Sequence, residues 1–167
     1  TSILQEQDIV LGKNISGEPL LGNVYALTIN THNAESFTVE VLHVHNWKDH
    51  TAVDANTTLQ IADKVIELAN ESKNDGKPVI HCKAGVGRTG QVLGALVMQQ
   101  DKDNTMSLES IVTDMRNSRN GHMVQNNDQL KVLTKIAAAQ NRLILTPSPE
   151  LVQQEVQELS DASFVVA

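Results

Sequence analysis

The stretch Pro78–Gly90, PVIHCKAGVGRTG, decides the expected fold of this 167-residue chain. Val79 and Ile80 form a short apolar run of the kind that fills a buried strand, and apolar residues recur at helical spacing from Leu93 onward. Between them lies a glycine-rich segment with one cysteine and one arginine. We therefore predict a buried strand, a tight loop and a helix, in that order.

The five residues between Cys82 and Arg88 are enough to wrap a single loop in front of the helix. In such a loop the backbone N–H groups point inward and form a concave site for an oxyanion. The same N–H groups and the helix terminus favour the thiolate form of Cys82. Arg88 supplies a planar fork that matches two oxygens of a phosphate group. The pattern predicts a nucleophile beside an anion site.

Two other interpretations of this stretch compete with that one. GVGRTG, residues 85–90, satisfies the G-x-G-x-x-G pattern of dinucleotide-binding loops. That pattern requires a second strand that ends in an acid about 20 residues further on, whereas polar DKDNT follows at 101–105 and precedes another helical pattern. The other alternative, a buried and inert cysteine beside a glycine turn, leaves Arg88 unexplained.

The residues His-Cys-x5-Arg-Thr resemble the signature of the cysteine-dependent protein tyrosine phosphatases. The resemblance implies an α/β fold, a mixed twisted sheet flanked by helices, with Cys82 at a strand-to-helix turn. It implies hydrolysis of phosphotyrosine in proteins through a cysteinyl-phosphate intermediate, with no cofactor and no metal. Thr89 would stabilise Cys82 as a leaving group, and His81 would orient the loop by hydrogen bonding. The implied substrate-binding residues are Lys83, Ala84, Gly85, Val86, Gly87 and Arg88.

Two further segments match the same family. WKD at 47–49 is similar to the family's Trp-Pro-Asp loop, with Lys48 in place of proline, which implies that Trp47 anchors the loop and that Asp49 is the general acid and then the base. MVQNNDQ at 123–129 resembles the glutamine loop, which implies that Gln125 and Gln129 hold the attacking water.

The rest of the chain predicts one hairpin and several helices. Residues 24–30 and 37–45 alternate and are rich in β-branched side chains, with turn residues between them. His43 and His45 share one face of the second strand, but no cysteine or carboxylate at ligand spacing completes a metal site. Helical periodicity covers about 59–70, with Asn56 or Thr57 as the cap, and then 89–100, 107–116 with Ser107 as the cap, and 128–140.

Composition and charge narrow the class of partner. The formal net charge of −7 argues against nucleic acid and anionic membranes as partners. The resemblance implies that the partners are phosphotyrosine-containing proteins. The single cysteine excludes an intrachain disulfide. We find no apolar run long enough to span a bilayer and no signal-peptide pattern, and the oligomeric state is left open.

The segments together look most like the tyrosine phosphatases that bacteria inject through type III secretion, which implies action in the host cytoplasm. We expect residues 1–145 to form the C-terminal part of the family domain, its N-terminal part being absent, and 146–167 to form a tail. Two rival functions stay open: a dual-specificity or phosphoinositide phosphatase, and a non-catalytic phosphotyrosine-binding module.

Overall fold

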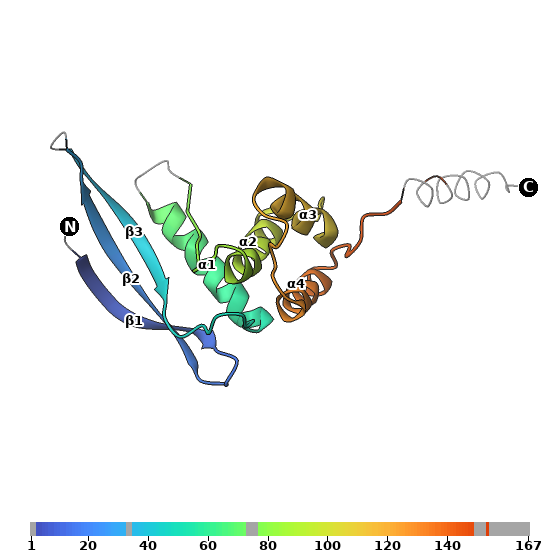
Figure 1. The fold of residues 1–167 in the computed structure, drawn as a ribbon, viewed down its shortest axis with the longest axis horizontal. Coiled ribbons are helices and arrows are strands. Elements are labelled where there is room, and N and C mark those ends of the chain that lie inside the picture. Colours follow the sequence, from blue (N-terminus) through green and yellow to red (C-terminus); the bar gives the residue numbers. More distant parts are fainter. Residues whose placement is uncertain (1–2, 33–34, 73–76, 149–152, 154–167) are drawn as a thin grey trace, which may run out of the picture.

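The computed structural model describes residues 3–32, 35–72, 77–148 and residue 153. A three-stranded sheet stands beside a group of helices, and α1 lies between the sheet and the other helices (Figure 1). The strands are β1 (Ile3–Lys13), β2 (Pro19–Asn30) and β3 (Ser36–Val44). The helices are α1 (Ala55–Glu71), α2 (Gly87–Gln100), α3 (Leu108–Ser118) and α4 (Asn127–Ala139).

The sheet is antiparallel, in the order β1-β2-β3. The hairpin predicted from the alternating residues is confirmed, with Tyr25 opposite Val41 in the register of β2 and β3. The segment before it supplies β1 and the start of β2. The backbone N–H of Lys13 donates to the hydroxyl of Thr57 at 3.0 Å, which ties the end of β1 to the first turn of α1.

The helical core forms around α2, which contacts each of the other three helices. Its buried apolar residues pack against those of α1, α3 and α4 because each of these helices presents one apolar stripe. Fully buried residues from all four helices are Ile61, Ala62, Ala95, Met98, Ile111, Leu133 and Ile136. The loop before α2 is therefore held on a rigid support.

The helix caps follow the sequence prediction in one of two cases. Ser107 caps α3 by accepting the backbone N–H of Ser110, as predicted. The predicted cap of α1 at Asn56 or Thr57 is wrong: Asp54 accepts the N–H of Thr57 at 2.7 Å and starts the helix earlier. An ionised carboxylate at this position also interacts favourably with the helix dipole.

The α/β class is confirmed, but the strand predicted at Val79 and Ile80 is wrong. Val79 is 88% exposed, and residues 77–82 form no strand. A cavity of about 880 Å³ separates this segment from β3, with α1 side chains along one wall. Because no described strand lies beside the segment, it has no ladder partner, and the sheet of the described residues is antiparallel rather than mixed.

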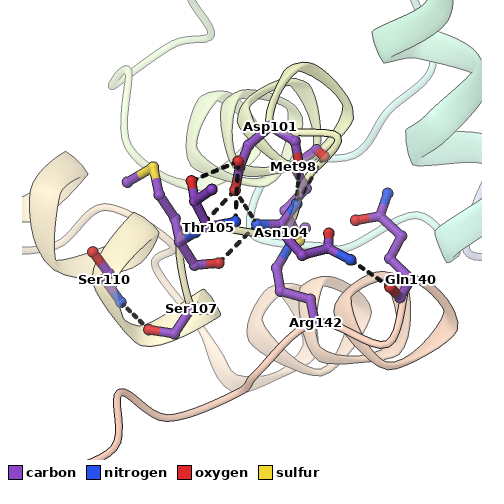
Figure 2. Close-up of polar contacts among 9 residues, drawn as sticks. Met98, Asp101, Asn104, Thr105, Ser107, Ser110, Gln140 and Arg142 are labelled. Carbon is purple, nitrogen blue, oxygen red and sulfur yellow. Dashed lines mark hydrogen bonds and ion pairs between the residues drawn. The ribbon is translucent and has the colours of Figure 1, made fainter.

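A buried arginine joins the ends of α2 and α4 (Figure 2). Arg142 is 4% exposed, and its Nη1 lies 2.5 Å from Oδ2 of Asp101. It also donates to the backbone carbonyls of Met98, Asp101 and Met106. The guanidinium of Arg142 holds the pKa of the Asp101 carboxyl well below its ordinary range. This ion pair holds the C-terminal ends of α2 and α4 together.

Among the described residues, no helix is long and apolar enough to cross a membrane. Most of the predicted tail at 146–167 lies outside the described residues. Thr146, at its start, lies against α3, where its backbone N–H donates to Glu109 and its hydroxyl lies 2.8 Å from that of Ser107. The division into a domain at 1–145 and a tail stays a prediction.

Candidate active site

The segment from Cys82 to Arg88, here called the cysteine loop, curls in front of α2, and its last two residues already belong to that helix. Gly85 has a φ of +72°, a left-handed conformation that side chains other than glycine adopt with strain. The backbone N–H groups of Gly85, Val86 and Thr89 donate to the sulfur of Cys82. The loop therefore turns its amides inward around the sulfur, as the glycine spacing predicts.

The acidity of the Cys82 thiol follows from this arrangement. Burial alone would raise its pKa, but the Thr89 hydroxyl and the surrounding backbone N–H groups stabilise the thiolate and lower the pKa from 9.0 to about 7. The Thr89 hydroxyl is buried, and apart from the Cys82 sulfur it has no hydrogen-bond partner among the described groups. The cysteine loop therefore favours the thiolate form of Cys82.

Arg88 connects the cysteine loop to residues 46–54, here called the acid loop. Its Nη1 donates to the carbonyl of Trp47 at 2.9 Å, and its Nη2 lies 3.0 Å from Oδ1 of Asp49. Its Nε is buried and has no hydrogen-bond partner within the described chain. A buried, unpartnered guanidinium N–H beside an acidic thiol is the arrangement that binds an oxyanion.

The acid loop is fixed at several points. Trp47 is 6% exposed, and its indole N–H donates to the carbonyl of Thr51 at 3.1 Å. Asn46 pairs with the backbone of β2 at Pro19 and Leu21. The carbonyl of Lys48 accepts both the N–H and the hydroxyl of Thr51, which closes a turn over Asp49. These contacts hold the Asp49 carboxylate at the cysteine loop.

Residues 123–129, here called the glutamine loop, cover the other side of the cysteine loop. Gln129 is fully buried: its Oε1 accepts the N–H of Gln125, and its Nε2 donates to the carbonyl of Thr51 at 3.2 Å. A Cβ built on Gly87 would lie 2.7 Å from Oε1 of Gln125, so this amide approaches the loop closely. Gln129 braces the acid loop, and Gln125 faces the cysteine loop.

The comparisons with known proteins agree with this geometry. The family model of the protein-tyrosine phosphatases matches residues 20–139. The chain belongs to the protein-tyrosine phosphatase family. The matched region contains the acid loop, the cysteine loop and the glutamine loop.

Three relatives show how far the similarity extends. Tyrosine-protein phosphatase YopH of Yersinia pseudotuberculosis is 40% identical over 143 residues, which cover 77% of this chain and 31% of that protein. Secreted effector protein SptP of Salmonella typhi is 36% identical over 118 residues, which cover 66% of this chain and 21% of that protein. Receptor-type tyrosine-protein phosphatase eta of Gallus gallus is 36% identical over 64% of this chain and 8% of its own. The chain thus spans about a third of the length of YopH and smaller shares of the other two proteins.

The remaining predicted site residues lie in or beside the cysteine loop. Lys83 and Ala84 are exposed at its rim, and Gly85 to Thr89 are buried or half-buried. His81 is exposed, and its imidazole makes no hydrogen bond within the described chain. Its orienting role stays a prediction.

Three residues that connect the acid, cysteine and glutamine loops to their surroundings were not predicted from the sequence. Gln91 is fully buried in α2 and donates to the carbonyl of Val53, which anchors the end of the acid loop. Asn126 caps α4 and donates to the carbonyl of His50. Arg119, at the end of α3, donates to the carbonyl of Gly85. A glutamine in an otherwise apolar helix was the available signal for Gln91, because buried polar groups need partners.

The histidines considered for a metal do not gather at the site. The rings of His43, in β3, and His45, which follows the strand, have centroids 4.4 Å apart. Within the described residues, no group of three His, Cys, Asp or Glu side chains is placed to hold a metal ion.

Proposed function

We propose that this protein hydrolyses phosphotyrosine in proteins through a phosphorylated Cys82. The observation that carries the proposal is the pairing of an acidic thiol, with a pKa of about 7, with the buried and unpartnered Nε of Arg88. The thiolate supplies the nucleophile, and the guanidinium and loop amides supply a site for the oxygens of a phosphoryl group. The family match supports the same chemistry.

In the first step, the Cys82 thiolate attacks phosphorus, a P–S bond forms and the bond to the tyrosine oxygen breaks. Asp49 donates its proton to the departing phenolate oxygen. As the phosphoryl group enters, its oxygens take the place of the Asp49 carboxylate on Nη2 of Arg88. The carboxylate is thereby released, takes up a proton from solvent, and lies beside the leaving group as the acid.

In the second step, water attacks phosphorus, the P–S bond breaks and inorganic phosphate leaves. Asp49 accepts the proton of the water, and the Thr89 hydroxyl stabilises the Cys82 thiolate as it departs. The side-chain amides of Gln125 and Gln129 both approach Gly87 of the cysteine loop, and together they hold the water. Gln129 also accepts the backbone N–H of Gln125.

The charge around the cysteine loop supports a phosphotyrosine substrate. Lys83 and Arg88 are the cations within the cysteine loop, and the chain carries a net charge of −7. A phosphoinositide headgroup, which carries several phosphates, would need more positive charge around the loop. A single aryl phosphate needs only the backbone N–H groups of the cysteine loop and Arg88.

The experiment that tests the function compares three substrates: a phosphotyrosyl peptide, a phosphoseryl peptide and a phosphoinositide. The proposal expects turnover of the first, its loss in Cys82→Ser, and much slower turnover of the other two. Equal turnover of all three would indicate a dual-specificity or lipid phosphatase. Binding of the phosphotyrosyl peptide without any turnover would indicate a binding module.

We also propose that the protein is a bacterial effector that acts in the host cytoplasm. The proposal is supported by the 36% identity to SptP, which is itself named as a secreted effector. The test is to tag the protein in its source bacterium, infect cultured cells, and assay the host cytoplasm with and without the secretion system. Retention inside the bacterium would contradict this placement.

A further inference from the structure

Arg119 contacts the cysteine loop from outside. It is the C-cap residue of α3, where its backbone N–H donates to the carbonyl of Met115. Its Nε donates to the carbonyl of Gly85 at 3.2 Å. A Cβ built on Gly85 would overlap with Nη2 of Arg119, so the guanidinium lies directly against this backbone. The contact joins the cysteine loop to the C-terminal end of α3.

The Gly85 carbonyl belongs to the same peptide unit as the N–H of Val86. In a trans peptide, the C=O and N–H bonds point in opposite directions. The N–H of Val86 donates to the sulfur of Cys82 on the inner side of the loop. Arg119 and Cys82 therefore hold the two ends of one peptide group.

We infer that Arg119 is a positioning residue of the phosphatase site: its bond to the Gly85 carbonyl fixes the Gly85–Val86 peptide with the Val86 N–H directed at Cys82. The inference rests on the proposed function, since it concerns the same loop. A left-handed glycine can rotate with little steric resistance, so the peptide needs an external partner to keep one orientation. The cation also polarises the peptide and strengthens the N–H donor on its inner side.

If Arg119 had only a structural role, its loss would lower stability without changing the acidity of Cys82. Arg116 provides the matched control. Arg116 lies on the same helix, and its Nε donates to the carbonyl of Met123 at 3.1 Å. The two arginines thus make the same kind of bond, but only Arg119 bonds to the cysteine loop. Loss of either bond affects stability, whereas only loss of the Arg119 bond changes the surroundings of the sulfur.

The test measures the rate of Cys82 alkylation by iodoacetamide against pH, the affinity for orthovanadate, and the unfolding temperature. The variants are Arg119→Gln, Arg119→Lys and Arg116→Gln. We expect Arg119→Gln to raise the alkylation midpoint by roughly 0.5–1 pH unit, since one donor to the thiolate loses its orientation. Vanadate should bind about 5–10-fold more weakly. Arg119→Lys, which keeps a donor without the fork, should shift the midpoint less.

The other charged and titratable groups around Cys82 remain unchanged in every variant. They are its neighbours His81 and Lys83, Arg88 in the loop, Asp49 opposite Arg88, and, along the walls of the same cavity, Glu40, His43 and Lys77. Arg116→Gln should therefore keep the wild-type midpoint. An equal rise in Arg116→Gln would reduce Arg119 to a general structural role and overturn the inference.

A folded Arg119→Gln with the wild-type midpoint and vanadate affinity would also overturn it. If Arg119→Gln does not fold, Arg119→Lys decides: a raised midpoint supports the inference, and an unchanged one contradicts it. The alkylation readout needs no turnover, so it tests the role of Arg119 even if the phosphatase function fails. Conversely, an active enzyme with an unchanged midpoint in the Arg119 variants would leave the function standing and remove only this inference.

Discussion

Nη2 of Arg88 lies 3.0 Å from Oδ1 of Asp49, so the expected general acid and the expected oxyanion-binding cation form an ion pair. The Arg88 side chain is 22% exposed and that of Asp49 is 42% exposed, so water screens the pair only in part. The carbonyl of Trp47 occupies Nη1 of the same guanidinium. An arriving phosphoryl group therefore competes with the acid loop for Arg88.

This competition predicts opposite effects of Asp49→Asn on binding and on turnover. Turnover of a phosphotyrosyl peptide should fall by roughly 10²–10⁴-fold, because the phenolate loses its proton donor. Vanadate affinity should stay equal or rise, because the neutral amide holds Arg88 less strongly. Stopped assays and equilibrium titration measure the two quantities. An aryl phosphate with an acidic leaving group is the control and should lose much less rate; equal losses would give Asp49 a structural role.

Lys48→Pro tests the departure from the family's Trp-Pro-Asp sequence. Proline fixes φ near −65° and reduces the freedom of the open loop. In the described structure the N–H of Lys48 donates to no partner, and its carbonyl, which proline keeps, accepts from Thr51. We expect faster turnover of the phosphotyrosyl peptide and a vanadate affinity within a few-fold of wild type. Turnover at or below wild type would mean that lysine already suits the loop.

Gly87→Ala should slow the second chemical step selectively. The added Cβ would lie 2.7 Å from Oε1 of Gln125 and 2.9 Å from Nε2 of Gln129, so it displaces amides rather than core side chains. A rapid-quench assay should show a burst of tyrosine release followed by slow turnover, because hydrolysis of the intermediate depends on the positioned water. Gly121→Ala is the control, since nothing lies within 4 Å of its added Cβ. Loss of the burst itself would show that Gly87 serves the first step.

Asp101→Asn should lower the unfolding temperature at neutral pH, because it removes the charged partner of buried Arg142. The pKa of Asp101 is depressed in the folded state, so its contribution is present above the unfolded pKa of about 3.9 and is lost as pH falls below it. The difference between wild type and variant should therefore narrow below about pH 4. Thermal unfolding from pH 3 to pH 7 measures it. A difference that is constant across this range would exclude a role for the carboxylate charge.

Much of the fold follows from periodicity alone. The alternation in residues 24–30 and 37–45 predicted the hairpin, and apolar spacing predicted the four helices of the described residues to within a few positions. The spacing of Cys82 and Arg88 predicted the loop between them, because five residues and several glycines leave few ways to close it. Local pattern suffices where the partner groups lie nearby in sequence.

The features that the sequence did not predict depend on contacts between segments far apart in the chain. Val79 and Ile80 are apolar, but a strand needs a neighbour, and none of the described strands lies beside them. Val124 has a φ of +59°, unfavourable for a β-branched residue and invisible in the sequence; here its N–H donates to the carbonyl of Val86. Arg119 looked like any exposed arginine. Its significance lies in a bond to Gly85, 34 positions away.

The central claim is that Cys82 carries the phosphoryl group during turnover. The direct measurement mixes the Gly87→Ala variant with a phosphotyrosyl peptide, quenches in acid, and analyses the cysteine-containing peptide by mass spectrometry. The proposed chemistry predicts the added mass of one phosphoryl group on Cys82, formed at the rate of the tyrosine burst and absent in Cys82→Ser. Tyrosine release by wild type and variant with no phosphoryl group on Cys82 at any time, or release that persists in Cys82→Ser, would contradict it.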